Sequence, residues 1–305
     1  MGELRQEPKL SVYMITYNNE RTVEKALRSV TWADEIVVVD SFSNDRTVEI
    51  SRQFTDKVLQ RKWSGHRDQY QYAADLTTHD WVMFVDADEE VSPELAQEIR
   101  EALSRKAGEV DGFFVYRRTF YLGRWIRYGG WYPDGEIRLY RRDKGRWEGG
   151  LHARVVVDGR VQSLKNLYHH YNYRDISDQI QTIDKYSRIA AEDMAREGET
   201  FSLFKLLFHP PFRFIKEYFF KSGFRDGLPG LVIALSTTYY VFIKYAKFWE
   251  LTRSTADLQP QHGSKASPSS GGDEQKGRSG STLSRPQPSG LDAEGLSRTR
   301  KGEKK

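Results

Sequence analysis

The sequence predicts an α/β fold, built on a mostly parallel sheet with helices on both faces and followed by a C-terminal helical region. Three short apolar runs are typical of strands: Leu10–Thr16, Glu35–Asp40 and Trp81–Val85. The second run is apolar on both faces, as expected of a parallel strand that helices cover on each side. Segments with helical spacing separate the runs, and this alternation indicates βαβ units in an open sheet.

The expected helices are recognised by apolar spacing and by the residues at their ends. Ser92 and Pro93 begin the clearest one, because serine is a favoured N-cap and proline suits the first helical position. This helix is expected to end near Ser104, and a short third strand is expected at Lys57–Gln60. Apolar spacing places the other helices of this part at Arg21–Val30, Arg46–Phe54 and Gln69–Leu76.

The pattern changes after Asp111. Gly112–Arg118 and Glu136–Arg141 are expected to be strands of a smaller, mixed sheet, and Ser177–Arg196 is expected to be a helix. We divide the chain into three parts on this basis. These are an N-terminal α/β domain over residues 1–173, a C-terminal helical region over 174–254 and a tail over 255–305.

Composition limits the partners and the chemistry. The 305 residues include no cysteine, which excludes disulfides and cysteine-bound zinc. Residues 255–305 hold no aromatic residue, so we expect this tail to be disordered. The tail carries three of the four net positive charges, and the nearly neutral remainder argues against nucleic acid as a partner. The first residues lack the apolar core of a signal peptide, so we expect the chemistry to be cytoplasmic.

Polar and acidic residues follow the three main strands, in the segments Thr16–Glu20, Asp40–Asp45 and Asp86–Glu89. Ligands of open α/β sheets bind beyond the carboxyl ends of the strands, so these segments are expected to line a site. Two carboxylates one residue apart, Asp86 and Asp88, can share Mg²⁺ or Mn²⁺ with a diphosphate. Such a cation neutralises charge on a departing nucleoside diphosphate. The alternative is that the aspartates cap the helix that follows.

Three blocks in this order and spacing carry a resemblance to a known family. They are Leu10-Ser-Val…Thr16-Tyr-Asn-Asn-Glu20, Asp34-Glu-Ile-Val-Val-Val-Asp40-Ser-Phe-Ser-Asn-Asp45-Arg-Thr47 and Trp81-Val-Met-Phe-Val-Asp86-Ala-Asp88-Glu89. Together they resemble glycosyltransferase family 2 and, within it, the lipopolysaccharide core β-1,4-glucosyltransferase group, over about residues 10–250. The resemblance implies a GT-A type, Rossmann-like fold and an inverting, single-displacement transfer of a sugar from a nucleotide sugar.

The same resemblance implies that five residues bind the nucleotide sugar: Thr16, Glu20, Asp40, Arg67 and Asp86. Asp40 would bind the base or the ribose, whereas Thr16 and Glu20 would border the nucleotide. Asp86 would contact the ribose or the metal side of the donor, and Asp88 would be the main metal ligand. Arg67 would face the diphosphate, or else be a solvated surface residue.

An inverting transfer needs a base that takes the proton of the attacking acceptor hydroxyl. The candidates lie after the aspartate pair: Asp134, Glu136, Glu148 and His152. Many relatives have a glutamate directly after this histidine, whereas this chain has Ala153, so Asp134 and Glu148 are the preferred bases. His152 is expected either near the metal and diphosphate or in a structural role. The run Tyr168-His169-His170-Tyr171 would suit the edge of a site, but a histidine pair without an aspartate is more often structural.

The segment 210–249 mixes aromatic residues with cations. Pro210–Arg225 has this mixture at helical spacing, and Lys244–Trp249 repeats it. Between them, residues 227–243 are uncharged but number 17, fewer than the roughly 20 apolar residues that span a bilayer. A basic segment with aromatic margins is typical of binding to an anionic membrane surface. The alternative is a helical hairpin that covers the catalytic domain.

These expectations converge on a hexosyltransferase that uses a nucleotide sugar, with UDP-glucose the donor that the resemblance implies. The expected acceptor is a lipid-linked saccharide such as a lipopolysaccharide inner core, and the enzyme is expected to associate peripherally with the inner face of the cell membrane. Polyprenyl phosphate is an alternative acceptor, because it is already ionised and needs no base. The other alternative is a non-catalytic carbohydrate-binding or assembly protein, against which the intact pair Asp86 and Asp88 argues.

Overall fold

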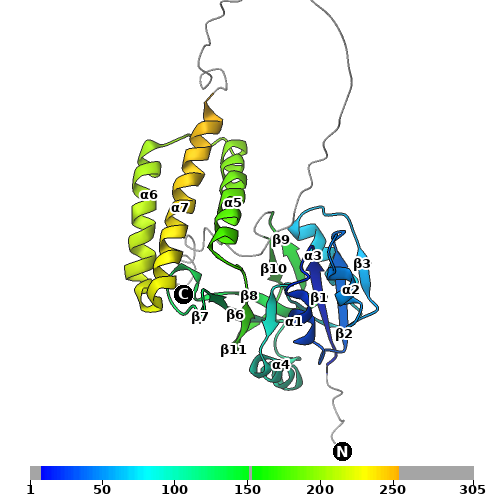
Figure 1. Cartoon of the computed structure of the whole chain (residues 1–305). Coiled ribbons are helices and arrows are strands. Elements are labelled where there is room, and N and C mark those ends of the chain that lie inside the picture. Colours follow the sequence, from blue (N-terminus) through cyan, green and yellow to red (C-terminus); the bar gives the residue numbers. More distant parts are fainter. Residues whose placement is uncertain (1–7, 151–152, 254–305) are drawn as a thin grey trace, which may run out of the picture.

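The structure, a computed structural model, describes residues 8–150 and 153–253 (Figure 1). An α/β unit built around one large sheet occupies the N-terminal part of the chain, and the C-terminal helices stand beside it (Figure 1). The tail expected at 255–305 lies outside the described residues.

One half of the main sheet is parallel. β1 (Leu10–Thr16) lies between β2 (Glu35–Asp40) and β4 (Trp81–Phe84), and it is parallel to both. β3 (Val58–Gln60) pairs in parallel with β2 at the edge of the sheet. Parallel strands need crossover connections, and the helical segments between these strands supply them, as the sequence predicts.

The other half of the sheet is mixed. β8 (Asp134–Arg141) is antiparallel to β4 and to β6 (Gly112–Tyr121), and β6 pairs in parallel with β11 (Val161–His170). β5 (Glu89–Val91) is antiparallel to β11, and β7 (Arg124–Trp125) pairs with β6. The expectation of a separate, smaller sheet in this part of the chain is wrong, because the pairing of β8 with β4 joins these strands to the main sheet.

Three helices share a core with one face of the sheet: α1 (Val23–Arg28), α2 (Thr47–Ser51) and α4 (Pro93–Lys106). Their apolar side chains pack with alternate strand residues such as Met14, because successive side chains of a strand point to opposite faces. The Ser92 hydroxyl caps α4 as expected and accepts a backbone N–H at 3.1 Å.

The opposite face is covered by α3 (His66–Asp75). A small antiparallel sheet of β9 (Gly145–Glu148) and β10 (Arg154–Val157) packs into the same core. Trp147 of β9 stacks on Tyr70 of α3, with 4.2 Å between the ring centroids. Helices therefore cover both faces of the sheet, as the sequence predicts.

The C-terminal helices pack side by side (Figure 1). α7 (Gly227–Thr252) contacts both α5 (Ile176–Arg196) and α6 (Leu203–Ile215). A π-helical turn, η2 (Lys216–Phe220), and a 3₁₀ turn, η3 (Gly223–Asp226), connect α6 to α7.

Within the part of the chain that the structure describes, one helical segment, Gly223–Thr252, is long and apolar enough to cross a membrane by length and composition. A share of 33% of its most apolar window is buried in the protein. Tyr240, Tyr245 and Phe248 are among the buried residues of α7. Packing against the neighbouring helices thus accounts for part of its apolar character.

Candidate active site

Asp40 ties together the ends of three strands. The parallel register sets it beside Thr16, whose hydroxyl donates to Asp40 Oδ1 at 3.0 Å. The Ser43 hydroxyl also donates to Oδ1, while the Ser43 backbone N–H and the Gln60 amide donate to Oδ2 at 2.8 and 3.1 Å. These donors fill the roughly four acceptor positions of a carboxylate. A contact between Asp40 and a nucleotide, as predicted, needs one of them to be displaced.

Glu20 and Arg67 are both exposed. The Glu20 carboxylate accepts the Arg46 backbone N–H, and the Glu20 N–H donates to Asp45, both at 3.2 Å. This joins the loop after β1 to the loop after β2. Arg67 lies in the first turn of α3. Their roles at the nucleotide and the diphosphate remain predictions.

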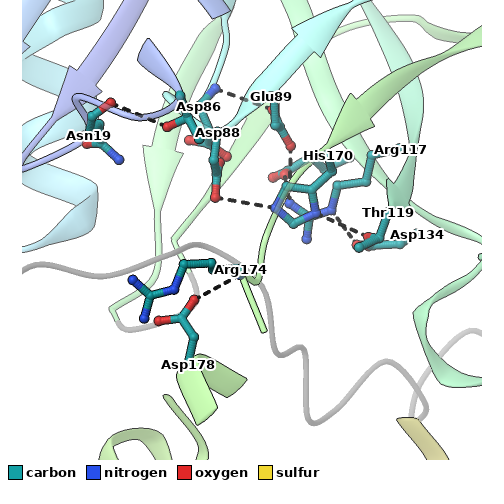
Figure 2. Close-up of polar contacts among 12 residues, drawn as sticks. Asn19, Asp86, Asp88, Glu89, Arg117, Thr119, Asp134, His170, Arg174 and Asp178 are labelled. Atoms are coloured by element: carbon teal, nitrogen blue, oxygen red, sulfur yellow. Dashed lines mark hydrogen bonds and ion pairs between the residues drawn. The ribbon is translucent and has the colours of Figure 1, made fainter. Parts of the chain in front are cut away.

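Asp86 follows β4 and is buried. The Tyr70 hydroxyl donates to one of its oxygens, and Arg138 donates to the other at 3.3 Å. Its backbone N–H donates to Glu89 at 3.3 Å (Figure 2). Burial alone would raise the pKa of Asp86, but the Arg138 charge and the Tyr70 hydrogen bond hold it below its usual range. Asp86 is therefore an ionised group that fixes the turn after β4.

Arg138 of β8 is the centre of a buried ionic cluster. Its guanidinium is 1% exposed, donates to Glu89 at 2.7 and 2.9 Å and lies 2.7 Å from Glu136. Arg117 of β6 lies 3.5 Å from Glu89 and donates to Asp134 (Figure 2). Buried charges are tolerated when they are paired and hydrogen-bonded, which these contacts achieve.

Asp134 and Glu136 form the open side of this cluster. Their side chains are each 28% exposed, whereas those of the acids in the segment Asp86–Glu89 are at most 10% exposed. Burial opposes ionisation of Asp134, but the charge and hydrogen bond of Arg117 keep its pKa below the usual range. Burial raises the pKa of Glu136 to about 7 despite the charges of Arg138 and Arg117. A carboxylate with this pKa is suited to proton transfer near neutral pH.

Asp88 lies beside His170 at the end of β11 (Figure 2). The distance between Asp88 Oδ2 and His170 Nε2 is 3.6 Å, and the Asp88 carbonyl accepts the Tyr171 N–H at 3.0 Å. The Thr119 hydroxyl lies 3.2 Å from the other ring nitrogen, Nδ1. His170 is 2% exposed, and its Nε2 has no hydrogen-bond partner among the described residues. Buried polar atoms are normally paired, so this nitrogen is suited to a ligand.

Asp88 and His170 are the residues best suited to hold a divalent cation. No group of three or more His, Cys, Asp or Glu side chains that could hold an ion occurs in the described part of the chain. Mg²⁺, however, usually takes one or two protein carboxylates and completes its coordination with substrate phosphates and water. The Asp88 carboxylate fits this pattern, and the imidazole nitrogen beside it is a ligand of the kind that transition metals take. The oxygens of Asp86 accept hydrogen bonds from Tyr70 and Arg138, whereas Asp88 Oδ2 lies 3.6 Å from His170 Nε2.

The predicted catalytic residues are only partly brought together. Asp134 lies in the cluster, where its partner is Arg117. Glu148 ends β9 and instead forms an ion pair with Arg146 of the same strand at 2.6 Å. The structure gives it no contact with the cluster within the described residues. His152 lies outside the described residues.

Three cluster residues escaped prediction from the sequence: Arg117, Arg138 and His170. They belong to β6, β8 and β11, and the pairing of these strands brings them to the aspartates. A pattern for His170 does exist, because it ends an alternating run before Tyr171. Its neighbour His169 obscured that pattern, since a pair of adjacent histidines resembles a structural feature.

Comparison with known proteins identifies the family of the segment that contains most of these residues. Residues 11–157 match the model of the family described as glycosyl transferase family 2. These residues therefore form a domain of this family. The match includes the aspartate pair after β4 and the carboxylates of β8, whereas His170 lies beyond it. The predicted enzyme class, a nucleotide-sugar-dependent glycosyltransferase, and the predicted GT-A type α/β fold are both confirmed.

Two curated relatives extend the similarity beyond the family domain. The lipopolysaccharide core biosynthesis glycosyltransferase LpsC of Rhizobium meliloti is 29% identical over 254 residues, which cover 79% of this chain and 92% of LpsC. An uncharacterised glycosyltransferase of Rickettsia typhi is 29% identical over 268 residues, which cover 82% of this chain and 90% of the relative. Alignments of this length include part of the C-terminal helices.

Some solved structures are similar to this chain at low identity and with low TM-scores. Residues 1–349 of S. aureus TarS, in complex with UDP-GlcNAc, are 17% identical with a TM-score of 0.42, covering 83% of this chain and 93% of that one. Glucosyl-3-phosphoglycerate synthase of Mycobacterium tuberculosis, in complex with Mn²⁺ and UDP-glucose, is 16% identical with a TM-score of 0.39, covering 63% and 80%. Scores this low carry no argument about the ligands of this chain.

Proposed function

We propose that this glycosyltransferase moves a hexose, expected to be glucose, from a UDP-sugar to a lipid-linked saccharide such as a lipopolysaccharide inner core. The transfer would invert the anomeric carbon. The observation that supports this most is that Asp88, His170 and the carboxylate Asp134 belong to one cluster, in which Asp88 Oδ2 lies 3.6 Å from His170 Nε2 (Figure 2). It offers residues for the leaving group and for the acceptor in one place. The name of LpsC supports the choice of acceptor.

On the donor side, Asp88 and His170 would hold the divalent cation. Bound there, the cation would neutralise the charge that develops on the departing nucleoside diphosphate. Arg138 pairs with both Asp86 and Glu89, so the turn that carries Asp88 is fixed before the donor binds. Charges that are already in place stabilise a transition state without reorganisation.

On the acceptor side, a carboxylate of β8 would take the proton of the acceptor hydroxyl. The acceptor oxygen then bonds to the anomeric carbon as the bond from that carbon to the diphosphate oxygen breaks. Two carboxylates, Asp134 and Glu136, are exposed enough to meet the acceptor. The pKa of about 7 favours Glu136, whereas the place of Asp134 at the start of β8, next to the preceding loop, favours Asp134.

A lipid-linked acceptor would bring the enzyme to a membrane. The exposed surface of α6, of the turns that follow it and of the start of α7 supports this. We call ten large, exposed side chains the apolar face: Leu203, Phe204, Leu207, Phe208, Phe212, Ile215, Phe219, Phe220, Phe224 and Leu228. Exposed apolar areas of this size mark contacts with membranes or proteins. From Leu203 to Arg253 the chain has eight lysines and arginines, and two of its three acids, Glu217 and Asp226, are buried.

Exposed cations beside an apolar face suit one partner above others. Anionic headgroups attract the cations, and the acyl boundary takes up the aromatic and aliphatic side chains. We therefore expect the enzyme to associate peripherally with the anionic inner face of the cell membrane. A protein partner with an acidic rim would instead bind in the absence of lipid.

A screen of donors and acceptors tests the proposal. The purified enzyme is incubated with UDP-glucose, UDP-galactose or UDP-GlcNAc, with and without Mn²⁺, and with membrane extract or polyprenyl phosphate as acceptor. We expect incorporation of glucose into the saccharide of the extract, dependent on the divalent cation. Incorporation into polyprenyl phosphate would replace the proposed acceptor. Failure to turn over any nucleotide sugar would overturn the proposal.

A further inference from the structure

The connection from β7 to β8 is fastened to the turn between α6 and α7. Asp226 of η3 is fully buried, and its Oδ2 accepts the backbone N–H groups of Arg127 at 2.9 Å and Tyr128 at 2.8 Å. The Arg124 guanidinium donates to the Asp226 carbonyl at 2.9 Å and lies 3.5 Å from Oδ1. One buried carboxylate thus binds the segment 124–128, which lies about a hundred residues earlier in the chain.

Two more contacts complete the attachment. Gly129, the first residue of the 3₁₀ turn η1 (Gly129–Trp131), donates its N–H to the Lys221 carbonyl at 2.9 Å. Gly130 packs so closely on Glu217 that a Cβ at this position would lie 2.5 Å from the carboxyl group. We call these contacts of Asp226, Lys221 and Glu217 with residues 124–130 the clamp.

In the turn between α6 and α7, the acidic side chains point inward to the clamp, whereas cations and aromatic rings are exposed. Glu217 and Asp226 are 2% and 0% exposed. The exposed part of the turn consists of members of the apolar face and of neighbouring cations: Phe219, Phe220, Phe224, Leu228, Lys221 and Arg225. This is the chemistry that binds the headgroup layer of an anionic bilayer. The π-helical form of η2 at this point agrees with a functional role, since π-helical turns are frequent at functional sites.

The clamped segment leads directly into the active site. η1 ends at Trp131, and β8 begins at Asp134, whose carboxylate belongs to the ionic cluster. A shift of the segment 124–130 would therefore move the residues that precede the proposed base. The clamp thus links the surface that meets the membrane to the strand that meets the acceptor.

We propose that the clamp couples membrane docking to acceptor binding. When the apolar face binds an anionic bilayer, the clamp holds residues 124–133 at the level of the headgroups, where a lipid-linked acceptor reaches β8. Asp226 is then a positioning residue, since it acts through this segment and not on the reacting atoms. The inference rests on the proposed lipid-linked acceptor, but the clamp can be measured without any substrate.

Amide hydrogen exchange tests the coupling with vesicles of phosphatidylglycerol and phosphatidylcholine. In the wild type, we expect the vesicles to slow exchange in residues 124–131 by about tenfold, because docking suppresses local opening. In Asp226→Ala, exchange there should be faster and the vesicle effect lost, while co-sedimentation with vesicles persists. The proposal is overturned if vesicles protect only α6 and its turn, or if Asp226→Ala exchanges like the wild type.

Kinetics distinguish positioning from a merely structural role. With membrane extract as acceptor, Asp226→Ala should raise the acceptor KM by about tenfold and leave the donor KM unchanged. Asp226→Asn should restore the acceptor KM, because an amide oxygen can still accept both N–H groups. An equal rise in the acceptor KM and the donor KM would contradict the proposal. Should Asp226→Ala not fold, Arg124→Gln removes one contact of the clamp at a half-exposed position and should show the same split.

Exchange and sedimentation need neither donor nor acceptor, so the two proposals fail in different ways. An enzyme without glycosyl transfer but with vesicle-dependent protection of residues 124–131 would refute the proposed function alone. An enzyme that transfers sugar to a lipid-linked saccharide without this protection would refute the clamp alone.

Discussion

His169 and His170 are neighbours in the chain but serve opposite faces of β11. His170 faces Asp88 and Thr119, whereas the ring of His169 lies 4.4 Å from that of Trp125. We expect His170→Ala to raise the Mn²⁺ concentration needed for half-maximal transfer by about 10–100-fold, as losses around metal sites do. His169→Ala is the matched control and should change this Mn²⁺ concentration little. Equal effects of the two variants would remove His170 from the metal site.

We expect Asp88 to contribute the larger part of the metal affinity. Asp88→Asn keeps the size of the side chain but loses the charge, so we expect folding to survive and cation-dependent transfer to be abolished. Mn²⁺ titration in the presence of UDP measures the loss directly. If Asp88→Asn turned over as fast as the wild type at limiting Mn²⁺, the metal role of Asp88 would be contradicted.

The carboxylates of β8 can be told apart from Glu148 by substitution. Removing a general base lowers a rate by about 10²-fold or more, so either Asp134→Asn or Glu136→Gln should lower transfer to this extent with donor binding retained. Glu148→Gln should act like the wild type, because Glu148 pairs with Arg146 outside the cluster. Loss of transfer in Glu148→Gln alone would identify Glu148 as the base, as one of the two sequence predictions has it. Full activity in all three would indicate an acceptor that needs no base.

Glu136 also makes the stability of the protein depend on pH. Its pKa of about 7 lies above the ordinary 4.5, so the folded state binds this proton more tightly than the unfolded state. The group therefore costs stability as pH rises above 4.5, by up to about 3 kcal/mol once the pH exceeds 7. Urea unfolding should find Glu136→Gln more stable than the wild type near pH 8 and equal to it near pH 5. A difference that does not change with pH would contradict this.

The residues that the sequence could predict are those with a local pattern. Asp86 and Asp88 stand out because a buried strand precedes them and a capped helix follows. Arg138 and His170 have no such pattern, since their function arises when β8 and β11 bring them to the aspartates. Glu136 appeared among the candidates, but only burial beside the cluster reveals its raised pKa.

Among the strands, the parallel ones were predicted well and the mixed ones were not. β1 and β2 match the expected ranges, because continuous apolar runs mark strands buried on both faces. β6 and β8 were expected to be strands, but sequence spacing does not reveal which strand pairs with which. α6 is helical across Pro210 and Pro211, which local preference opposes and tertiary packing overrides.

Asp40 shows how one side chain organises three elements. Because it accepts hydrogen bonds from Thr16, Ser43 and Gln60, Asp40→Ala leaves several buried or half-buried donors without a partner. We expect the loss of about 1–3 kcal/mol in unfolding free energy, together with a raised donor KM, since the loops beside the predicted donor site loosen. Thermal unfolding and donor kinetics measure the two effects. A lowered rate of chemistry with an unchanged donor KM would contradict the donor-side placement.

The distribution of charge over the molecule indicates a partner, whereas the net charge does not. The net charge of +4 is small, yet the region from Leu203 to Arg253 combines eight cations with one exposed acid. The sequence predicts the mixture of cations and aromatic residues, but it could not show that Glu217 and Asp226 turn inward. That orientation depends on the contacts of these acids with the 124–130 segment, which lies far away in the chain.

Binding to vesicles distinguishes a membrane surface from a packing surface. The wild type should co-sediment with phosphatidylglycerol vesicles and bind phosphatidylcholine vesicles less. Each cation near the surface contributes about 1 kcal/mol, and salt screens this attraction over about 10 Å at 0.1 M, so binding should weaken as salt rises while the apolar part persists. Phe208→Ser with Phe212→Ser should lower the affinity at every salt concentration, because both side chains lose apolar area at the acyl boundary.

The control for this experiment is Ile176→Ser with Ile180→Ser, which changes exposed apolar residues of α5 outside the apolar face. This pair should leave vesicle binding unchanged, because α5 carries no part of that face. An equal loss with the α5 pair would mean that any exposed apolar side chain contributes. If the full-length protein ignores phosphatidylglycerol vesicles altogether, α6 and its turn form a surface for another partner. The coupling through Asp226 would then have no membrane to respond to, whereas the chemistry of Asp88, His170 and β8 would stand.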